Sequence, residues 1–190
     1  MLKKLISCVI ILKKTETVNE KRSRKEAYFL SKDKRPKTNA MRILDKMKIP
    51  YKANFYECDE FIDGVHIADK LSQPYEQSFK TLVTVGKSGE HFVFVIPIDK
   101  ELDMKKAAKS VGEKSVEMLH VKDIKNVTGY IRGGCTSVGM KKTFRTVVDE
   151  SAEKFEEIII SGGALGVQLF ITPENLLKAN GGTTCDIIKE

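Results

Sequence analysis

The sequence predicts an α+β fold built on a mixed β-sheet. The chain has 190 residues, of which 41% are hydrophobic, so it can hold one domain with a substantial core. Predicted strands outnumber predicted helices. Some strands follow one another directly, as in hairpins, and others are separated by a helix. This mixture is typical of α+β proteins, and the sequence contains no internal repeat.

The folded domain is expected to span residues 38–190 and to follow a basic N-terminal extension, residues 1–37. Residues 1–40 hold 12 Lys and Arg against 4 Asp and Glu, whereas the rest of the chain holds 21 against 22. Apolar positions do not recur periodically before the domain, so the extension is expected to be disordered. Because the domain itself is close to neutral, contact with nucleic acid would need a local basic patch.

The elements follow from local patterns in chain order. Thr38 or Asn39 can cap a first helix, and Pro50 ends it. Later, Asp103 can cap a helix that closes at Gly112. The other expected elements are a strand over 51–57, a helix over 65–71, a hairpin of strands 81–85 and 92–98, a helix over 121–126, strands over 145–149, 157–160 and 167–171, a helix from Pro173 to Gly181 and a strand over 184–188.

The cysteines and the apolar run near the N-terminus favour a cytoplasmic protein without a metal or cofactor. Cys8, Cys58, Cys135 and Cys185 show no paired spacing and no histidine at ligand spacing, which argues against zinc and disulfides. The apolar run from Leu5 to Leu12 is too short to cross a membrane. A lysine pair follows it where a signal peptide would have small residues.

Lys80 is the candidate for chemistry in the first half of the domain. It stands at the head of a β-branched run, and Phe79 and Leu82 suggest apolar walls around it. A partly desolvated ammonium there could bind a phosphate, a carbonyl or a ribose hydroxyl. The alternative is an ordinary solvated lysine at a sheet edge.

A glycine-rich segment, residues 128–142, is the second candidate. Main-chain N–H groups of Gly133 and Gly134 could face a developing oxyanion or a phosphate, or the pair could simply form a tight loop. The Thr136 hydroxyl could contact a ligand or satisfy the turn. Cys135 has no histidine tied to it by a motif, so a passive packing role is expected.

Basic residues bracket this segment, and a second glycine-bearing segment follows it. Arg132, Lys141, Lys142 and Arg145 form the dense basic cluster of the predicted domain and could contact a nucleic-acid backbone. Residues 161–166 are expected to form a hairpin turn. They do not match a phosphate-binding loop, because no Lys-Ser or Lys-Thr follows them. Paired carboxylates, HExxH and a Ser/His/Asp order are all missing from the sequence.

The order of four segments resembles the YbaK/EbsC family of aminoacyl-tRNA deacylases. The segments are residues 37–44, 79–82, 128–134 and 160–163, and the likeness extends from about Lys37 to Ile188. It implies a single domain with a curved mixed sheet flanked by helices, like the editing domain of some bacterial prolyl-tRNA synthetases. It also implies hydrolysis of Cys-tRNA(Pro), with prolyl-tRNA synthetase as a partner, no metal, and the substrate's own thiol as nucleophile.

The resemblance also assigns roles to individual residues. Lys80 matches the family's essential lysine. Tyr56, Thr81, Gly133 and Ser161 match positions that line the family's pocket. With the residues singled out above, the expected substrate contacts are Tyr56, Phe79, Thr81, Gly133, Gly134, Thr136, Ser161 and Gln168. The basic cluster supplies the expected tRNA contacts, Arg132, Lys141, Lys142 and Arg145.

Departures from the family pattern leave the amino-acid specificity open. Thr136 and Ser137 stand where the family often has Ser-Pro, Ala164 and Leu165 stand where Lys-Arg is common, and Gln168 replaces a frequent aspartate. One alternative is a deacylase for alanine or another small amino acid on tRNA. Another is a non-catalytic module that holds tRNA or a protein through the basic extension.

Overall fold

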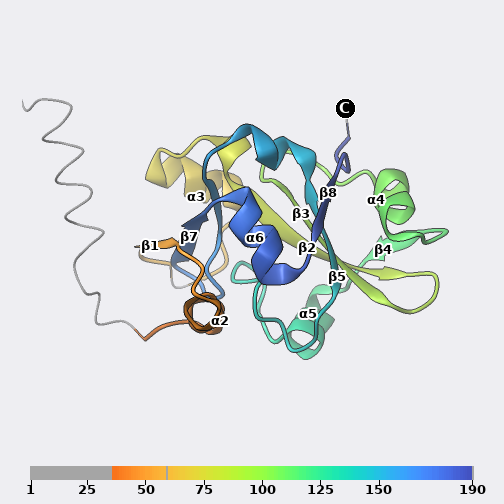
Figure 1. The fold of residues 1–190 in the computed structure, drawn as a ribbon, viewed down its shortest axis with the longest axis horizontal. Helices are drawn as coiled ribbons and strands as arrows, with labels where there is room; N and C mark the ends of the chain where they lie inside the picture. Colours follow the sequence, from red (N-terminus) through yellow and green to blue (C-terminus); the bar gives the residue numbers. More distant parts are fainter. Residues whose placement is uncertain (1–35, 59, 190) are drawn as a thin grey trace, which may run out of the picture. The chain divides into compact units, whose positions relative to one another are not determined.

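The computed structural model describes residues 36–58 and 60–189 and confirms the α+β class (Figure 1). The helices are α2 (Asn39–Met47), α3 (Gly64–Leu71), α4 (Met104–Val111), α5 (Val121–Thr128) and α6 (Pro173–Asn180). The strands are β1 (Lys52–Phe55), β2 (Phe79–Gly86), β3 (His91–Pro97), β4 (Val116–Met118), β5 (Arg145–Asp149), β6 (Ile158–Ser161), β7 (Val167–Ile171) and β8 (Thr183–Cys185). The predicted extension, residues 1–37, lies almost wholly outside the described residues, so it stays a prediction.

The strands form two sheets that meet at the start of β2. One sheet is antiparallel with the order β1-β7-β6, and the other is mixed with the order β4-β2-β3-β5-β8. A single bridge between Ser78 and Ile159 joins them. On its outer edge β2 pairs with β4 over Thr84–Gly86, and no other described strand pairs with residues 79–83 there. The expected mixed sheet is therefore split, and the split leaves an open edge.

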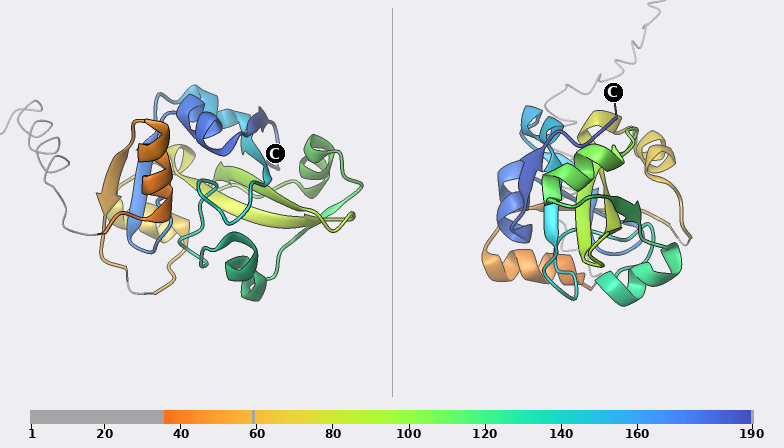
Figure 2. Two further views of the ribbon diagram at one scale, coloured as in Figure 1. Left: turned by 60° about the horizontal axis from the view of Figure 1, so that its bottom comes forward. Right: turned by 90° about the vertical axis from the view of Figure 1, so that its right-hand side faces the viewer.

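Helices flank the strands on more than one side (Figure 2), and two apolar cores hold these layers together. The larger core contains Leu44 of α2, Leu176 of α6 and Phe79 of β2, packed with the buried residues of β6 and β7. The second core lies on the opposite face of the mixed sheet, where Phe94 of β3 packs with Ala107 of α4. Both faces of β3 are thus buried, which explains its continuous apolar run.

Helix ends follow the predicted caps closely. The Thr38 hydroxyl caps α2 by accepting from Met41 N at 3.3 Å, and Asp103 caps α4 by accepting from two main-chain N–H groups. Gly112 ends α4 with a φ of 73°, as expected. β4 was not predicted, because its three residues are too few to show an alternating pattern.

Candidate active site

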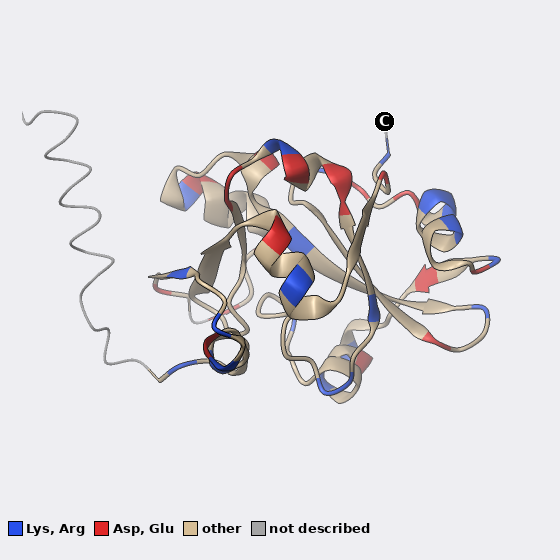
Figure 3. Cartoon of the chain, viewed as in Figure 1, with Lys and Arg blue, Asp and Glu red and all other residues tan. Residues whose placement is uncertain are grey.

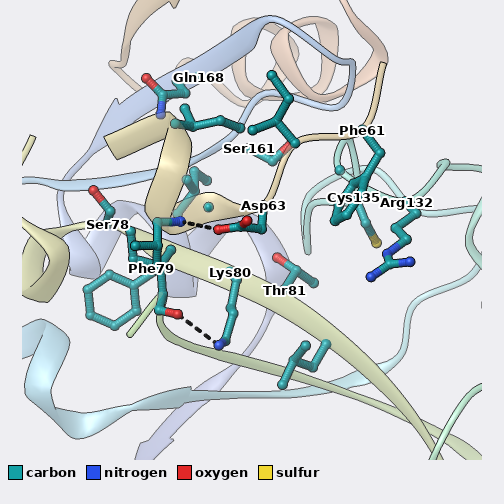
Figure 4. A pocket seen from close by; sticks show the side chains of 18 of the residues that line it. Phe61, Asp63, Ser78, Phe79, Lys80, Thr81, Arg132, Cys135, Ser161 and Gln168 are labelled. Atoms are coloured by element: carbon teal, nitrogen blue, oxygen red, sulfur yellow. Dashed lines mark hydrogen bonds between the residues drawn. The ribbon is translucent and has the colours of Figure 1, made fainter. Parts of the chain in front are cut away.

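A pocket of about 530 Å³ lies where β2 and β6 separate beyond their single bridge (Figure 4). Its walls come from the unpaired edge of β2, the segment before α3, the glycine-rich loop, and strands β6 and β7. The location follows from the fold: two sheets that share one bridge leave a wedge between them. A pocket of this size can hold a nucleoside with a small substituent.

Lys80 lies in this pocket with its ammonium held in place. Nζ donates to the main-chain oxygen of Ile98 at 2.9 Å. Burial lowers the pKa of Lys80. The negative charges of Asp99, Glu101 and Asp63 raise it, but by less than burial lowers it. The ammonium is therefore partly desolvated while keeping donor hydrogens for a ligand.

The open edge of β2 offers main-chain groups to the pocket. Ser78 O accepts from Ile98 N at 2.9 Å on the β3 side, and Val83 O accepts from Leu119 N at 2.9 Å on the outer side. Because bonding alternates along an antiparallel strand, the N–H and C=O of Thr81 also point outward. Its half-buried side chain lines the pocket as well.

The glycine-rich loop packs closely against two neighbouring segments. Gly133 lines the pocket with a φ of 81°, and a Cβ there would lie 2.9 Å from both Phe61 Cδ2 and Leu165 Cδ2. Gly134 is buried, and a Cβ on it would lie 3.1 Å from the main chain of Ala164. The two glycine-bearing segments thus pack on each other, and Phe61 occupies space beside Gly133.

Eight of the predicted residues line the pocket: Tyr56, Phe79, Lys80, Thr81, Arg132, Gly133, Ser161 and Gln168. Their side chains come from five separate segments, which the fold brings together. Burial raises the pKa of Tyr56 to about 12, so its phenol stays a hydrogen-bond donor at neutral pH. Cys135 also lines the pocket, and burial raises its pKa to about 11. A thiol with that pKa is protonated at neutral pH and is a poor nucleophile.

Five predicted residues do not line the pocket: Gly134, Thr136, Lys141, Lys142 and Arg145. Thr136 is fully buried, and its hydroxyl has no hydrogen-bond partner within residues 36–58 and 60–189. The Arg145 guanidinium donates to the carbonyls of Val111 and Ser110 at 3.0 and 3.2 Å, which satisfies the C-terminal end of α4. The structure therefore does not bring Arg145 to the site.

Positive charge does gather beside the pocket, on α5 and the loop that packs against it (Figure 3). Lys122 and Lys125 of α5 are exposed, as are Lys141 and Lys142. Lys141 ties the loop to the helix by donating to Asn126 O at 3.2 Å. The two α5 lysines were not singled out in the sequence, because nothing there showed that Val121 and Ile124 of the same helix would line the pocket.

Gln168 is fixed by a reciprocal pair of amide hydrogen bonds. Its Nε2 donates to Gln73 Oε1 at 3.0 Å, and Gln73 Nε2 donates back to Gln168 Oε1 at 2.9 Å. Asn54 Nδ2 adds a longer contact of 3.4 Å to the same oxygen. The amide is therefore a neutral and well-ordered part of the wall.

The pocket mouth carries exposed apolar side chains that sequence reasoning missed. Phe61, Met118 and Val121 are 42%, 47% and 55% exposed, although large apolar residues usually avoid water. The Arg132 guanidinium lies over the Phe61 ring, 4.0 Å from its centroid. The apolar pair at residues 61–62, inside a polar stretch, was the available signal.

Comparisons with known proteins agree on one family. The model of the aminoacyl-tRNA editing domain matches residues 65–179. A protein of Enterococcus faecalis, a candidate Cys-tRNA(Pro)/Cys-tRNA(Cys) deacylase named EbsC, is 45% identical over 152 residues, which are 80% of this chain and 93% of the relative.

Two solved structures share the fold. One is a candidate trans-editing enzyme for prolyl-tRNA synthetase, with a TM-score of 0.70, 22% identity, and coverage of 82% of this chain and 100% of that one. The other is a hypothetical protein with a TM-score of 0.73, 20% identity, and coverage of 80% and 99%. At these identities the likeness concerns the fold alone.

Among the described residues, no group of three or more His, Cys, Asp or Glu side chains could hold a metal ion. No described helix has the length and hydrophobicity needed to cross a membrane.

Proposed function

The chain belongs to the aminoacyl-tRNA editing domain family, among the YbaK/EbsC proteins, and we propose that it hydrolyses cysteine from mischarged Cys-tRNA(Pro). The half-buried ammonium of Lys80, held in a pocket at an open sheet edge, is the observation that carries this proposal. The name of the Enterococcus faecalis relative supports the choice of substrate.

The pocket supplies orientation and charge stabilisation. Lys80 and the outward main-chain N–H of Thr81 are placed to stabilise negative charge that develops on the ester carbonyl oxygen. The apolar walls and Tyr56 hold the ester and the terminal adenosine in one geometry. Neither contribution requires a nucleophile from the protein.

The nucleophile in this proposal is the thiol of the cysteinyl group itself. Its sulfur forms a bond to the ester carbonyl carbon and loses its proton to solvent. The bond from that carbon to the ribose oxygen then breaks, and the ribose oxygen takes up a proton to become a hydroxyl. The thiolactone that leaves reacts with water to give free cysteine, so no redox change occurs. The protonated state of Cys135 supports this assignment, because the pocket's own thiol is not activated.

The tRNA is proposed to approach across α5. Lys122, Lys125, Lys141 and Lys142 can neutralise phosphates of the acceptor end, with Arg132 at the pocket mouth. The domain is otherwise close to neutral, so we propose that prolyl-tRNA synthetase assists binding, in the cytoplasm where charged tRNA is used.

Single-turnover hydrolysis of three charged tRNAs tests the function. We expect fast release of cysteine from Cys-tRNA(Pro), and almost no release from Ala-tRNA(Pro) or from tRNA(Pro) carrying S-methylcysteine, because both of these lack the nucleophile. Equal rates for Cys- and S-methylcysteinyl-tRNA would exclude the thiol mechanism. Preference for Ala-tRNA(Pro) would show an alanine deacylase, and no hydrolysis of any substrate would favour a binding module.

A further inference from the structure

Of the described residues that line the pocket, only Asp63 carries a carboxylate. We propose that Asp63 binds the α-ammonium group of the aminoacyl ester. The inference rests on the proposed function, because it assumes that an aminoacyl ester occupies the pocket. It adds the residue that recognises the amino group, a feature that all such esters share.

Asp63 is fixed in position by its role at the start of α3. Its Oδ1 accepts from Val65 N at 3.0 Å and from His66 N at 3.2 Å, and its Oδ2 contacts His66 Nδ1. These bonds lower the pKa of the carboxyl, which is therefore ionised at neutral pH. The side chain remains 50% exposed, and a carboxylate has about four acceptor sites, so it can accept a further donor.

Asp63 and Lys80 have opposite charges on the same pocket but do not pair. Lys80 Nζ donates to Ile98 O, and the ion pair that Asp63 makes among the described residues is with His66. Ile98 borders both segments: its main-chain oxygen accepts from Lys80 Nζ, and a Cβ on Gly64, the residue after Asp63, would come 2.9 Å from Ile98 Cγ2. The Asp63 carboxylate and the Lys80 ammonium therefore do not neutralise each other. Two such groups on one pocket wall suit a ligand that carries both a positive and a negative group.

An aminoacyl ester at its reaction centre is such a ligand. The carbonyl oxygen gains negative charge as the thiol attacks, while the amino group on the adjacent α-carbon is an ammonium. Among the described residues, the other charged groups on the pocket wall are Lys80 and Arg132, which would repel that ammonium. Gln168 offers no charge, and its amide is already committed to Gln73. Asp63 is therefore the group that compensates the substrate's positive charge.

Binding of an analogue that cannot be hydrolysed tests the assignment without relying on catalysis. The probes are 3′-deoxy-3′-(cysteinylamino)adenosine, in which an amide replaces the ester, and its Nα-acetyl form, which carries no ammonium. Calorimetry near pH 7 keeps the free amine mostly charged, since an α-amino pKa is roughly 7.7–8.0. The protein is the full chain and its variants Asp63→Asn and Asp103→Asn.

Asp103→Asn is a matched control for the helix cap. Asp103 caps α4 as Asp63 caps α3, accepting from Lys105 N and Lys106 N at 2.8 and 2.9 Å, but it does not line the pocket. Asparagine retains an acceptor for the cap in both variants. An effect on the fold common to both would thus appear in the control.

We expect Asp63→Asn to weaken binding of the free-amine analogue by about tenfold to a hundredfold, the worth of one charged hydrogen bond. Acetylation should weaken binding to the unchanged protein by a similar factor, and the two changes together should cost no more than either alone. An equal loss for both analogues in Asp63→Asn, or no loss for the free amine, overturns the assignment. If the unchanged protein binds both analogues equally well, the ammonium site fails while the proposed function stands. If it binds neither, the proposed function fails too.

Discussion

The two halves of β2 have the same partner on one edge and different surroundings on the other. Both halves pair with β3 along their length, but β4 covers the outer edge only over Thr84–Gly86. The first half, residues 79–83, borders the pocket and carries Lys80. The second half is closed, and Thr84 within it is fully buried. The candidate chemistry thus lies where strand pairing is left incomplete, because an unpaired edge keeps main-chain and side-chain groups available for a ligand.

The strongest test of this difference is Lys80→Ala in the first half of β2, the open half, whose outer edge is unpaired. We expect the single-turnover rate on Cys-tRNA(Pro) to fall at least a hundredfold, which corresponds to about 2.7 kcal/mol of lost transition-state stabilisation. The matched control is Lys87→Ala, because Lys87 is exposed in the turn at the other end of the strand. It should change the rate less than twofold. Normal activity of Lys80→Ala would move the catalytic centre away from the open edge.

A second test compares two glycines with similar backbone angles. Gly133 beside the pocket has a φ of 81°, and Gly89 in the turn after β2 has a φ of 88°. Gly133→Ala should lower the free energy of unfolding by about 2–4 kcal/mol, since its Cβ would also meet Phe61 and Leu165 at 2.9 Å. Gly89→Ala has no atom within 4 Å of its Cβ and should cost only about 1 kcal/mol.

Denaturant unfolding of both glycine variants measures the difference, and hydrolysis assays accompany it. Only Gly133→Ala should also reduce activity, because Phe61 or Leu165 must shift at the pocket wall. Equal destabilisation by both substitutions would mean that positive φ alone explains Gly133 and that its close contacts are easily relieved.

Local features of the fold were predictable, and the open edge was not. The caps at Thr38 and Asp103 and the strand that carries Lys80 follow from residues close in sequence. The shape of the pocket depends on Ile159, which meets Ser78 from a distant part of the chain. Asp63 is an example of the limit: the sequence predicted a helix over 65–71, and the structure shows both that Asp63 caps this helix and that it lines the pocket.

Thr84→Val tests the closed half. The Thr84 hydroxyl is buried and has no hydrogen-bond partner in the part of the chain that the structure describes, so its removal should raise the free energy of unfolding by about 1 kcal/mol and leave activity unchanged. Thr146→Val is the matched control, because the buried Thr146 hydroxyl donates to Phe144 O at 3.0 Å. That variant should instead lose about 1 kcal/mol. Destabilisation by Thr84→Val would indicate that a water molecule forms a hydrogen bond with the Thr84 hydroxyl.

The smallest expected effect is the pH dependence that burial gives to Lys80. Burial lowers its pKa in the folded protein below the ordinary value of 10.5, so the unfolded chain binds more protons in that range. Below the folded-state pKa both states are charged, and the fold carries the cost of desolvating the ammonium. As the pH rises through that pKa towards 10.5, the folded lysine becomes neutral and the cost is relieved.

Stability of the unchanged protein should therefore increase with pH relative to Lys80→Met, which keeps the apolar stem and cannot titrate. Urea unfolding of both proteins, from about pH 8 upward, measures the difference in free energy, since the slope reports the protons bound by each state. A constant difference over this range would show that Lys80 is as well solvated as an ordinary surface lysine. The open half of β2 would then lack the partly desolvated cation on which the proposed chemistry depends.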